Sequence, residues 1–322
     1  MNQLSSGSAN GTIPRMGVCS GSRRRRTPDM AKSSSFVDSF CHRSGTGRAL
    51  RVPFAPFIQG KHMNDLIKQE RHEGVLTLTF DRPDKLNALN NRMYTQLADL
   101  LLAADEDDQT GVIILTGGAS CFTSGNDLAD FLQHPPTDLD SPAFRLMRVV
   151  IHLQKPLIAA VCGAAIGIGT TLLLHCDQVL VTRNAKLRMP FVNLGLCPEF
   201  GASLLLPRLL GHARAARLLL WGDSLDGAAA VACGLANELF DDGQQCLEAA
   251  ERMARRLLAL PRESLRQTRQ LLKQTLMPEL QATIRQENLL FIKRLKSPEA
   301  QTALNAILNR STDKKSLTGQ PS

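Results

Sequence analysis

Short apolar strands alternate with amphipathic helices through the middle of this 322-residue chain, and this alternation limits the folds that the chain can adopt. The strand-like segments are rich in Val, Ile and Leu and cover residues 75–80, 112–115, 157–162 and 178–182. Helical segments are expected at 91–104, 143–153 and 167–175. Because parallel strands need crossover connections, usually helices, the pattern predicts an α/β fold with parallel strands.

The last third of the chain has a different character. After about Gly201 the pattern is mostly helical, with one short strand-like piece at 236–240. These helices carry apolar faces that they cannot bury fully against one another. We therefore expect a core at residues 63–240 and a C-terminal helical layer at 241–322, which packs on the core and on other subunits and so serves oligomerisation.

Residues 1–62 differ from the rest of the chain in charge. They hold ten Lys or Arg against two Asp, whereas residues 63–322 hold 28 basic and 28 acidic residues, so the net charge of +8 belongs to this segment. It is rich in Ser, Gly and Arg and lacks apolar periodicity, which predicts a disordered extension. Two interpretations stay open: the segment precedes a natural start at Met63 in a cytoplasmic protein, or it is an organellar, mitochondrial transit peptide. A nucleic-acid-binding arm is the weaker alternative, so we expect no nucleic-acid partner.

Two further features exclude other classes of protein. The eight cysteines are scattered, with no C-x-x-C pair and no Cys/His cluster at metal-ligand spacing, so we expect free thiols and no metal site. The uncharged stretch 156–174 is nearly long enough for a membrane-spanning helix, but its three glycines divide it into a strand and the start of a helix. We therefore expect no membrane partner.

Two glycine-containing strand exits are the most informative local features, at 121–128 (CFTSGNDL) and 162–170 (CGAAIGIGT). Where a strand exits through glycines into a helix, consecutive backbone N–H groups lack intrahelical partners and point outward at the positive end of the helix dipole. Such donors can hold a developing oxyanion. A dinucleotide site is excluded, because G-x-G-x-x-G is not completed after Gly167 and Gly169 and no suitably placed acidic residue follows.

Five segments carry a more specific signal through their order and spacing: RPDKLNAL at 82–89, FTSGND at 122–127, KPLIAAVCG at 155–163, CD at 176–177 and PFVNLGL at 190–196. Together they resemble the crotonase superfamily, which is the enoyl-CoA hydratase/isomerase family. The resemblance runs from about residue 74 to residue 240 and, more weakly, through the C-terminal helices. It implies a crotonase-like spiral of repeated ββα units with a C-terminal helical layer, and an acyl-CoA thioester as substrate.

The resemblance also implies roles for individual residues. The family's two oxyanion-hole donors correspond to the backbone N–H groups of Ser124 and Ile168, which would both bind the thioester oxygen. Lys85 would lie near the CoA nucleotide, where a cation opposes phosphate charge, although a solvated turn lysine is an equal alternative. We prefer helix capping to acid–base chemistry as the role of Asp127. The loop residues expected to contact substrate are Ser124, Gly125, Asn126, Asp127, Leu128 and Gly167.

The residues at the family's acid–base positions favour isomerisation. Family hydratases use two glutamates, and this chain has Thr171 and Phe191 there, neither of which can serve as an acid or base. Glu199, in the segment LCPEFGAS, resembles instead the catalytic glutamate of the family's peroxisomal-type Δ3,Δ2-enoyl-CoA isomerases, which share the SGNDL loop. Phe191, Leu196 and Phe200 would give Glu199 an apolar setting, which raises the pKa of a carboxyl group.

These inferences give one principal hypothesis and two alternatives. The chain is expected to be a Δ3,Δ2-enoyl-CoA isomerase of fatty-acid β-oxidation, with Glu199 as base and no cofactor beyond the CoA of its substrate. The first alternative is an enoyl-CoA hydratase that uses Glu199 with an unconventional partner. The second is a non-catalytic acyl-CoA-binding paralogue, in which Glu199 only starts a helix. The resemblance implies a homotrimer or a hexamer.

Overall fold

Six strands form the main sheet, in the order β1-β2-β3-β4-β6-β9. The structure is a computed structural model that describes the backbone of residues 66–318 and the side chains as far as residue 309. The strands are β1 (Ile67–His72), β2 (Val75–Phe80), β3 (Val112–Thr116), β4 (Leu157–Val161), β6 (Gln178–Thr182) and β9 (Glu238–Phe240). β1 and β2 form an antiparallel hairpin, and every later pair is parallel. The predicted parallel sheet is confirmed, whereas the predicted extension at 1–62 lies outside the described residues.

A second, smaller sheet was not predicted from the sequence. It contains β5 (Ala164–Ile166), β7 (Lys186–Arg188) and β8 (Ser224–Asp226), with β5 parallel to β7 and β7 antiparallel to β8. Strands of three residues are too short to show a period of two, which explains why the sequence pattern missed them. Because β5 follows β4 after a turn of two residues, this sheet fixes the start of the second glycine loop.

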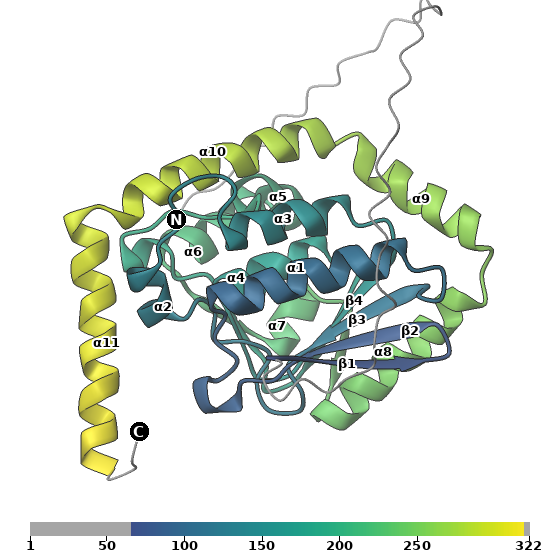
Figure 1. Cartoon of the computed structure of the whole chain (residues 1–322), viewed down its shortest axis with the longest axis horizontal. Helices are drawn as coiled ribbons and strands as arrows, with labels where there is room; N and C mark the ends of the chain where they lie inside the picture. Colours follow the sequence, from purple (N-terminus) through teal and green to yellow (C-terminus); the bar gives the residue numbers. More distant parts are fainter. Residues whose placement is uncertain (1–65, 319–322) are drawn as a thin grey trace, which may run out of the picture. The chain divides into compact units, whose positions relative to one another are not determined.

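The helices lie around the main sheet (Figure 1). Their bounds are α1 (Asn91–Glu106), α2 (Leu128–Gln133), α3 (Pro142–His152), α4 (Ile168–Thr171), α5 (Ala202–Leu210), α6 (His212–Leu220), α7 (Gly227–Ala232), α8 (Gly243–Leu258), α9 (Arg262–Gln274), α10 (Met277–Leu295) and α11 (Pro298–Thr318). The 3₁₀ turns are η1 (Pro83–Lys85), η2 (Leu172–His175) and η3 (Val192–Leu194). None of the helices in the described part of the chain is long and apolar enough to cross a membrane.

The two faces of the main sheet are covered by different helices, and the strands alternate accordingly. In β3, Ile113 and Leu115 face the larger core, which includes buried side chains of α1 and α3. Val112 and Ile114 face the smaller core, where α8 packs its buried alanines and Cys246. Each face thus receives every second strand residue, as the period of a β-strand requires.

Helix α8 lies C-terminal to the boundary that we predicted after residue 240, yet it packs on the second face of the sheet, against β2, β3, β4, β6 and β9. The main sheet would therefore be exposed on one face without it, and residues 243–258 belong to the core packing. Of the remaining C-terminal helices, α10 packs against α5, and α11 packs against α2 and η3 (Figure 1).

Candidate active site

The two glycine loops predicted from the sequence lie side by side. Thr123 pairs with Ala165 in an isolated parallel bridge, with the Thr123 N–H donating to the Ala164 carbonyl at 2.9 Å and the Ile166 N–H donating to the Thr123 carbonyl at 3.0 Å. Gly125 approaches the second loop so closely that a Cβ there would lie 2.8 Å from the Ile166 carbonyl oxygen. A side chain at Gly125 would therefore push the loops apart, so glycine is required there for packing as well as for its φ of +92°.

The first loop has one unoccupied amide, and it is not the amide that we predicted. The Ser124 N–H donates to the Leu86 carbonyl at 3.0 Å, so it is already used inside the fold. The amides of Gly125 and Asp127 are likewise occupied, by Thr123 Oγ1 and the Leu89 carbonyl. The Asn126 N–H has no acceptor among the described residues. The unoccupied amide of the first loop is therefore that of Asn126, whereas the predicted donor, Ser124, is engaged within the fold.

The geometry of the neighbouring bridge explains why the Asn126 amide is free. Leu89 and Asn126 form a parallel bridge, in which the Leu89 N–H donates to the Gly125 carbonyl at 2.8 Å and the Asp127 N–H donates to the Leu89 carbonyl at 2.9 Å. Leu89 thus bonds to the residues on either side of Asn126. Because adjacent peptide groups of an extended segment point in opposite directions, the Asn126 N–H points away from Leu89.

The second loop supplies a matching donor. Ile168 is the first residue of α4, so its N–H has no intrahelical acceptor, and none is found elsewhere in the described part of the chain. The preceding Gly167 has a φ of +57°, donates its own N–H to the Arg188 carbonyl at 2.8 Å and accepts from Thr170 and Thr171. Asn126 and Ile168 each follow a positive-φ glycine in adjoining loops. Both amides are unoccupied by acceptors of the described residues.

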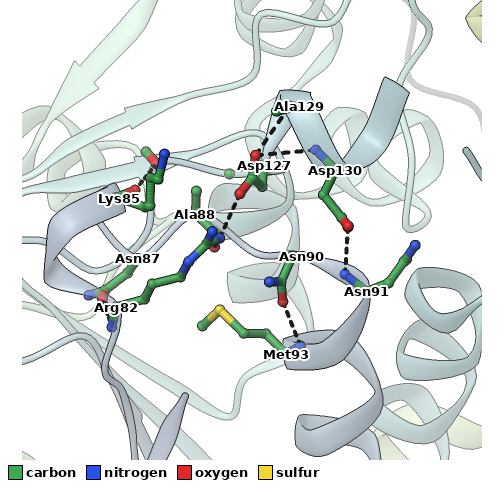
Figure 2. Close-up of polar contacts among 12 residues, drawn as sticks. Arg82, Lys85, Asn87, Ala88, Asn90, Asn91, Met93, Asp127, Ala129 and Asp130 are labelled. Atoms are coloured by element: carbon green, nitrogen blue, oxygen red, sulfur yellow. Dashed lines mark hydrogen bonds and ion pairs between the residues drawn. The ribbon is translucent and has the colours of Figure 1, made fainter. Parts of the chain in front are cut away.

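A network of polar side chains holds the first loop in place (Figure 2). Arg82 donates to Asp127 Oδ2 at 2.7 Å and to the Ala88 carbonyl at 3.0 Å. The other carboxylate oxygen of Asp127 accepts from the Ala129 and Asp130 amides, so Asp127 caps α2 as predicted. The network ties the segment after β2 to the loop that carries Asn126. The position of the Asn126 loop therefore depends on the segment after β2, through Arg82.

The other predicted substrate-contacting residues border the same loop. Lys85 is exposed at the end of η1, and its carbonyl accepts from Ser124 Oγ at 3.3 Å, so it lies next to the first loop (Figure 2). Leu128 is partly buried at the start of α2, which begins directly after the loop. The contact of Lys85 with a CoA nucleotide remains a prediction.

Tyr94, which the sequence did not single out, contacts the first loop. This fully buried side chain of α1 donates its hydroxyl to Asn126 Oδ1, in a very short hydrogen bond. Burial raises the pKa of Tyr94 well above its usual value, and the charge of Glu199 raises it further, so Glu199 is an electrostatic neighbour of Tyr94. Tyr94 therefore contacts the residue that carries the free amide and lies within electrostatic reach of the predicted base.

Glu199 is buried, with 2% of its surface exposed, and its Oε1 has no hydrogen-bond partner within the described residues. Phe191, Leu196 and Phe200, which we expected to surround Glu199, are also buried. Burial, and then the negative charge of Glu287, raise the pKa of Glu199 from 4.5 to about 8. A carboxyl group with this pKa can exchange a proton near neutral pH.

The burial of Glu199 has a measurable effect on stability. Its folded-state pKa of about 8 exceeds its ordinary value of 4.5, so the favourable contribution of the neutral carboxyl is complete below pH 4.5 and is lost as the pH rises towards 8. We expect Glu199→Gln to have a higher free energy of unfolding than the wild type at pH 8, by on the order of a few kcal/mol. The advantage should disappear near pH 4.5. Denaturant unfolding of both proteins at the two pH values measures this, and equal differences at both would contradict it.

The positions of the family's hydratase glutamates are occupied by buried, non-acidic side chains. Thr171 is fully buried at the end of α4, and its Oγ1 donates to the Ile168 carbonyl at 3.4 Å. Phe191 is 3% exposed just before η3. Neither side chain can hold a nucleophilic water as a carboxylate does, so Glu199 is the sole acid–base candidate at the three positions that the resemblance singled out.

Comparison with known proteins agrees with the motifs. The model of the enoyl-CoA hydratase/isomerase family matches residues 70–314. The chain is 38% identical over 206 residues to 1,2-epoxyphenylacetyl-CoA isomerase of Escherichia coli, covering 62% of this chain and 78% of that protein. It is 33% identical to 2,3-dehydroadipyl-CoA hydratase of the same organism, covering 78% and 98%. It is also 33% identical to human enoyl-CoA delta isomerase 2, covering 74% of this chain but only 62% of that longer protein.

Among solved structures, that of Pseudomonas aeruginosa OdaA matches with 52% sequence identity and a TM-score of 0.75, over 76% of this chain and 99% of that chain. The chain belongs to the enoyl-CoA hydratase/isomerase family, within the crotonase superfamily. This confirms the family and the fold class predicted from the sequence. The chain is accordingly an acyl-CoA-processing enzyme of the crotonase type, and the comparisons include both isomerases and a hydratase.

Proposed function

We propose that the chain is a Δ3,Δ2-enoyl-CoA isomerase. The observation that supports this most strongly is the placement of Glu199, a buried carboxyl whose Oε1 has no partner within the described residues. Its charge acts on Tyr94, which donates to Asn126 in the loop with the free amide. Moving a double bond needs one group that removes a proton and returns it elsewhere. Hydration by the family's usual pair needs two carboxylates, and Thr171 and Phe191 stand in their places.

The proposed mechanism proceeds in two proton transfers. Ionised Glu199 removes a proton from C2 of the 3-enoyl thioester, and the electron pair of that C–H bond moves to the thioester oxygen. The Asn126 and Ile168 amides donate hydrogen bonds to this oxygen and so stabilise the dienolate. Protonated Glu199 then delivers its proton to C4, the C3–C4 double bond becomes a C2–C3 double bond, and Glu199 returns to its ionised form.

The pH dependence of the reaction should report the state of Glu199. The base must be ionised before it can take a proton, and burial raises its pKa to about 8 in the free enzyme. We therefore expect kcat/KM for a 3-enoyl-CoA to rise about tenfold per pH unit below pH 8 and to level off above it. A pH series from 6 to 9.5 measures this. A profile that is already flat at pH 6 would show that Glu199 is not the group whose ionisation limits the rate.

Two substrates distinguish the proposed reaction from its alternatives. The purified protein is incubated separately with a 3-enoyl-CoA and with a 2-enoyl-CoA, and the products are separated and identified by mass. We expect the 3-enoyl-CoA to give its 2-enoyl isomer, without a gain of 18 mass units from water. Formation of a 3-hydroxyacyl-CoA from the 2-enoyl-CoA would favour a hydratase. Tight binding of both esters without turnover would favour a non-catalytic paralogue.

The assembly and cofactor requirements belong to the same proposal. We propose that the enzyme needs no cofactor beyond the CoA of its substrate, and that it forms a trimer or hexamer through its C-terminal helices. Exposed leucines on α9 and α10 support this assembly, because exposed apolar patches on a protein surface often mark contacts with other proteins. They are Leu271, Leu272, Leu289 and Leu290. Light scattering coupled to size-exclusion chromatography measures the mass, and a monomer at micromolar concentration would contradict the assembly.

A further inference from the structure

We propose that Glu287 of α10 is a positioning residue for Glu199: it fixes the loop that carries the base and, as a buried anion, opposes the ionisation of that base. His175 of η2 holds the same loop from the other side. The proposal rests on the proposed function of Glu199 for its catalytic meaning. The contacts that support it lie within the protein and do not involve substrate, so they can be tested without measuring enzyme activity.

Glu287 contacts the loop directly after Glu199. Its Oε2 accepts from the Gly201 N–H at 2.5 Å, and its Oε1 accepts from the Ser203 N–H at 3.0 Å and from Ser203 Oγ at 2.5 Å. Gly201 is the N-cap of α5, so the carboxylate of one helix caps the N-terminus of another. Burial raises the pKa of Glu287, while the Ser203 and Gly201 donors and the positive end of the helix dipole oppose that rise by stabilising the carboxylate. The charge of Glu287 in turn raises the pKa of Glu199.

His175 holds the opposite side of the loop. Its ring stacks on Phe200 with 4.0 Å between ring centroids, and its Nε2 lies 2.8 Å from the Phe200 carbonyl oxygen. A carbonyl can only accept, so Nε2 carries the hydrogen. Burial lowers the pKa of His175 to about 3, so the ring remains neutral, with Nε2 as a donor, at working pH. It is thus a constant anchor and does not titrate with Glu199.

The loop needs two anchors because its backbone is strained. Phe200 has a φ of +60° and Gly201 a φ of +74°, so two consecutive residues take the left-handed conformation. For Phe200 this conformation costs on the order of 1 kcal/mol or more, and it persists only where surrounding contacts hold it. His175 binds the carbonyl of Phe200, and Glu287 binds the next amide. These two hydrogen bonds fix the backbone that follows Glu199.

The two buried carboxyl groups have opposite surroundings. Glu287 has three hydrogen-bond donors, whereas Glu199 Oε1 has none. The titratable groups that face Glu199 are Tyr94 from α1, Cys197 from its own loop and Glu287 from α10. Tyr94 and Cys197 are neutral at physiological pH, because burial raises the pKa of both. Glu287 is therefore the one anion among these three neighbours, and its charge opposes ionisation of Glu199.

The discriminating variant is Glu287→Gln, which keeps the shape and one acceptor oxygen but removes the charge. Without the anion Glu199 ionises more easily, so the rising limb of the kcat/KM profile should move to lower pH by about one unit. The matched control is Glu279→Gln, which also lies on α10 and also contacts α5, through Arg208 at 2.7 Å, but is exposed. We expect no movement of the limb in the control. A limb that stays in place in Glu287→Gln, whatever the change in kcat, would overturn the proposal.

Contact and charge can be separated by Glu287→Asp, which also serves if Glu287→Gln does not fold. The shorter side chain keeps its charge but cannot span the same three contacts. We expect kcat to fall more than about tenfold while the limb stays at the wild-type pH, because the loop is displaced but the anion remains. Unchanged kcat in Glu287→Asp would show that the three contacts do not position the base.

A stability measurement distinguishes failure of this proposal from failure of the proposed function. The gain in unfolding free energy from Glu199→Gln at pH 8 is measured in the wild type and in the Glu287→Gln background, which needs no substrate. We expect the gain to shrink by half or more in that background, since the opposing charge is gone. An equal gain in both backgrounds would overturn the coupling of the two residues, even if isomerase activity is found. A smaller gain in an inactive protein would support the coupling and refute the isomerase function.

Discussion

Glu199→Gln lowers kcat on a 3-enoyl-CoA by on the order of 10²-fold or more, while KM stays within a few-fold of the wild type. Glutamine occupies the same volume and keeps an oxygen, but it cannot accept the C2 proton and return it to C4. The amides of Asn126 and Ile168 are unaffected, so binding of the thioester is retained. Steady-state kinetics with purified variant and wild type give both constants.

The matched control for this variant is Glu70→Gln, an exposed glutamate on β1 outside the site. It should keep wild-type kcat and KM. Full activity of Glu199→Gln would contradict the assignment of the base, whereas an equal loss in Glu70→Gln would indicate a general effect on the preparation. Because Glu199→Gln should also be more stable at pH 8, loss of activity cannot be attributed to unfolding.

Ile168→Pro lowers kcat/KM by about 10²- to 10³-fold, which is the usual effect of removing one oxyanion-hole donor. Proline lacks the N–H that we assign to the thioester oxygen. Ile168 is the first residue of α4, where proline is accepted because that N–H has no intrahelical partner. The substitution therefore removes the proposed donor with little damage to the helix.

Ile168→Val is the control for the loss of the side chain, since Ile168 is fully buried. It keeps the amide and loses one methyl group, with a cost of about 1 kcal/mol in stability. We expect kcat/KM within about tenfold of the wild type. If Ile168→Pro is folded by circular dichroism and as active as Ile168→Val, the amide of residue 168 does not take part in catalysis.

The elements with the strongest sequence periodicity were the ones predicted best. The strand at 178–182 coincides with β6, and the segment 112–115 falls inside β3. Asn90 stands directly before the helical pattern of α1, and its side chain caps this helix by accepting from the Met93 amide. Fully buried strands and side-chain caps are local signals, so they can be read without knowledge of the tertiary structure.

The choice between Ser124 and Asn126 could not be made from the same kind of signal. The carbonyl oxygens of Leu86 and Leu89 determine which amide of the first loop is free, because they accept hydrogen bonds from the Ser124 and Asp127 amides. Both leucines lie more than 30 residues earlier in the chain. Backbone hydrogen bonds between distant segments leave no trace in the type of residue. The resemblance pointed to this loop, and the fold was needed to find the unoccupied amide within it.

Glu287 left a signal that could have been noticed. It falls among the buried positions Leu280, Ile284, Phe291 and Leu295 of α10, so a glutamate stands on the apolar face of a helix. Burying a charge is costly unless it is paired or hydrogen-bonded, and such a residue therefore marks a structural or functional contact. Its partners at Gly201 and Ser203 lie more than 80 residues earlier and could only be identified from the fold.

The most direct test of the account is a crystal structure of Glu199→Gln with a bound 3-enoyl-CoA. We expect the thioester oxygen to lie about 2.7–3.1 Å from both the Asn126 and the Ile168 amide nitrogen, with the side-chain carboxamide at position 199 facing C2 and C4 of the acyl chain. A thioester oxygen bound to only one of these amides, or an acyl chain that passes far from position 199, would contradict the central claim.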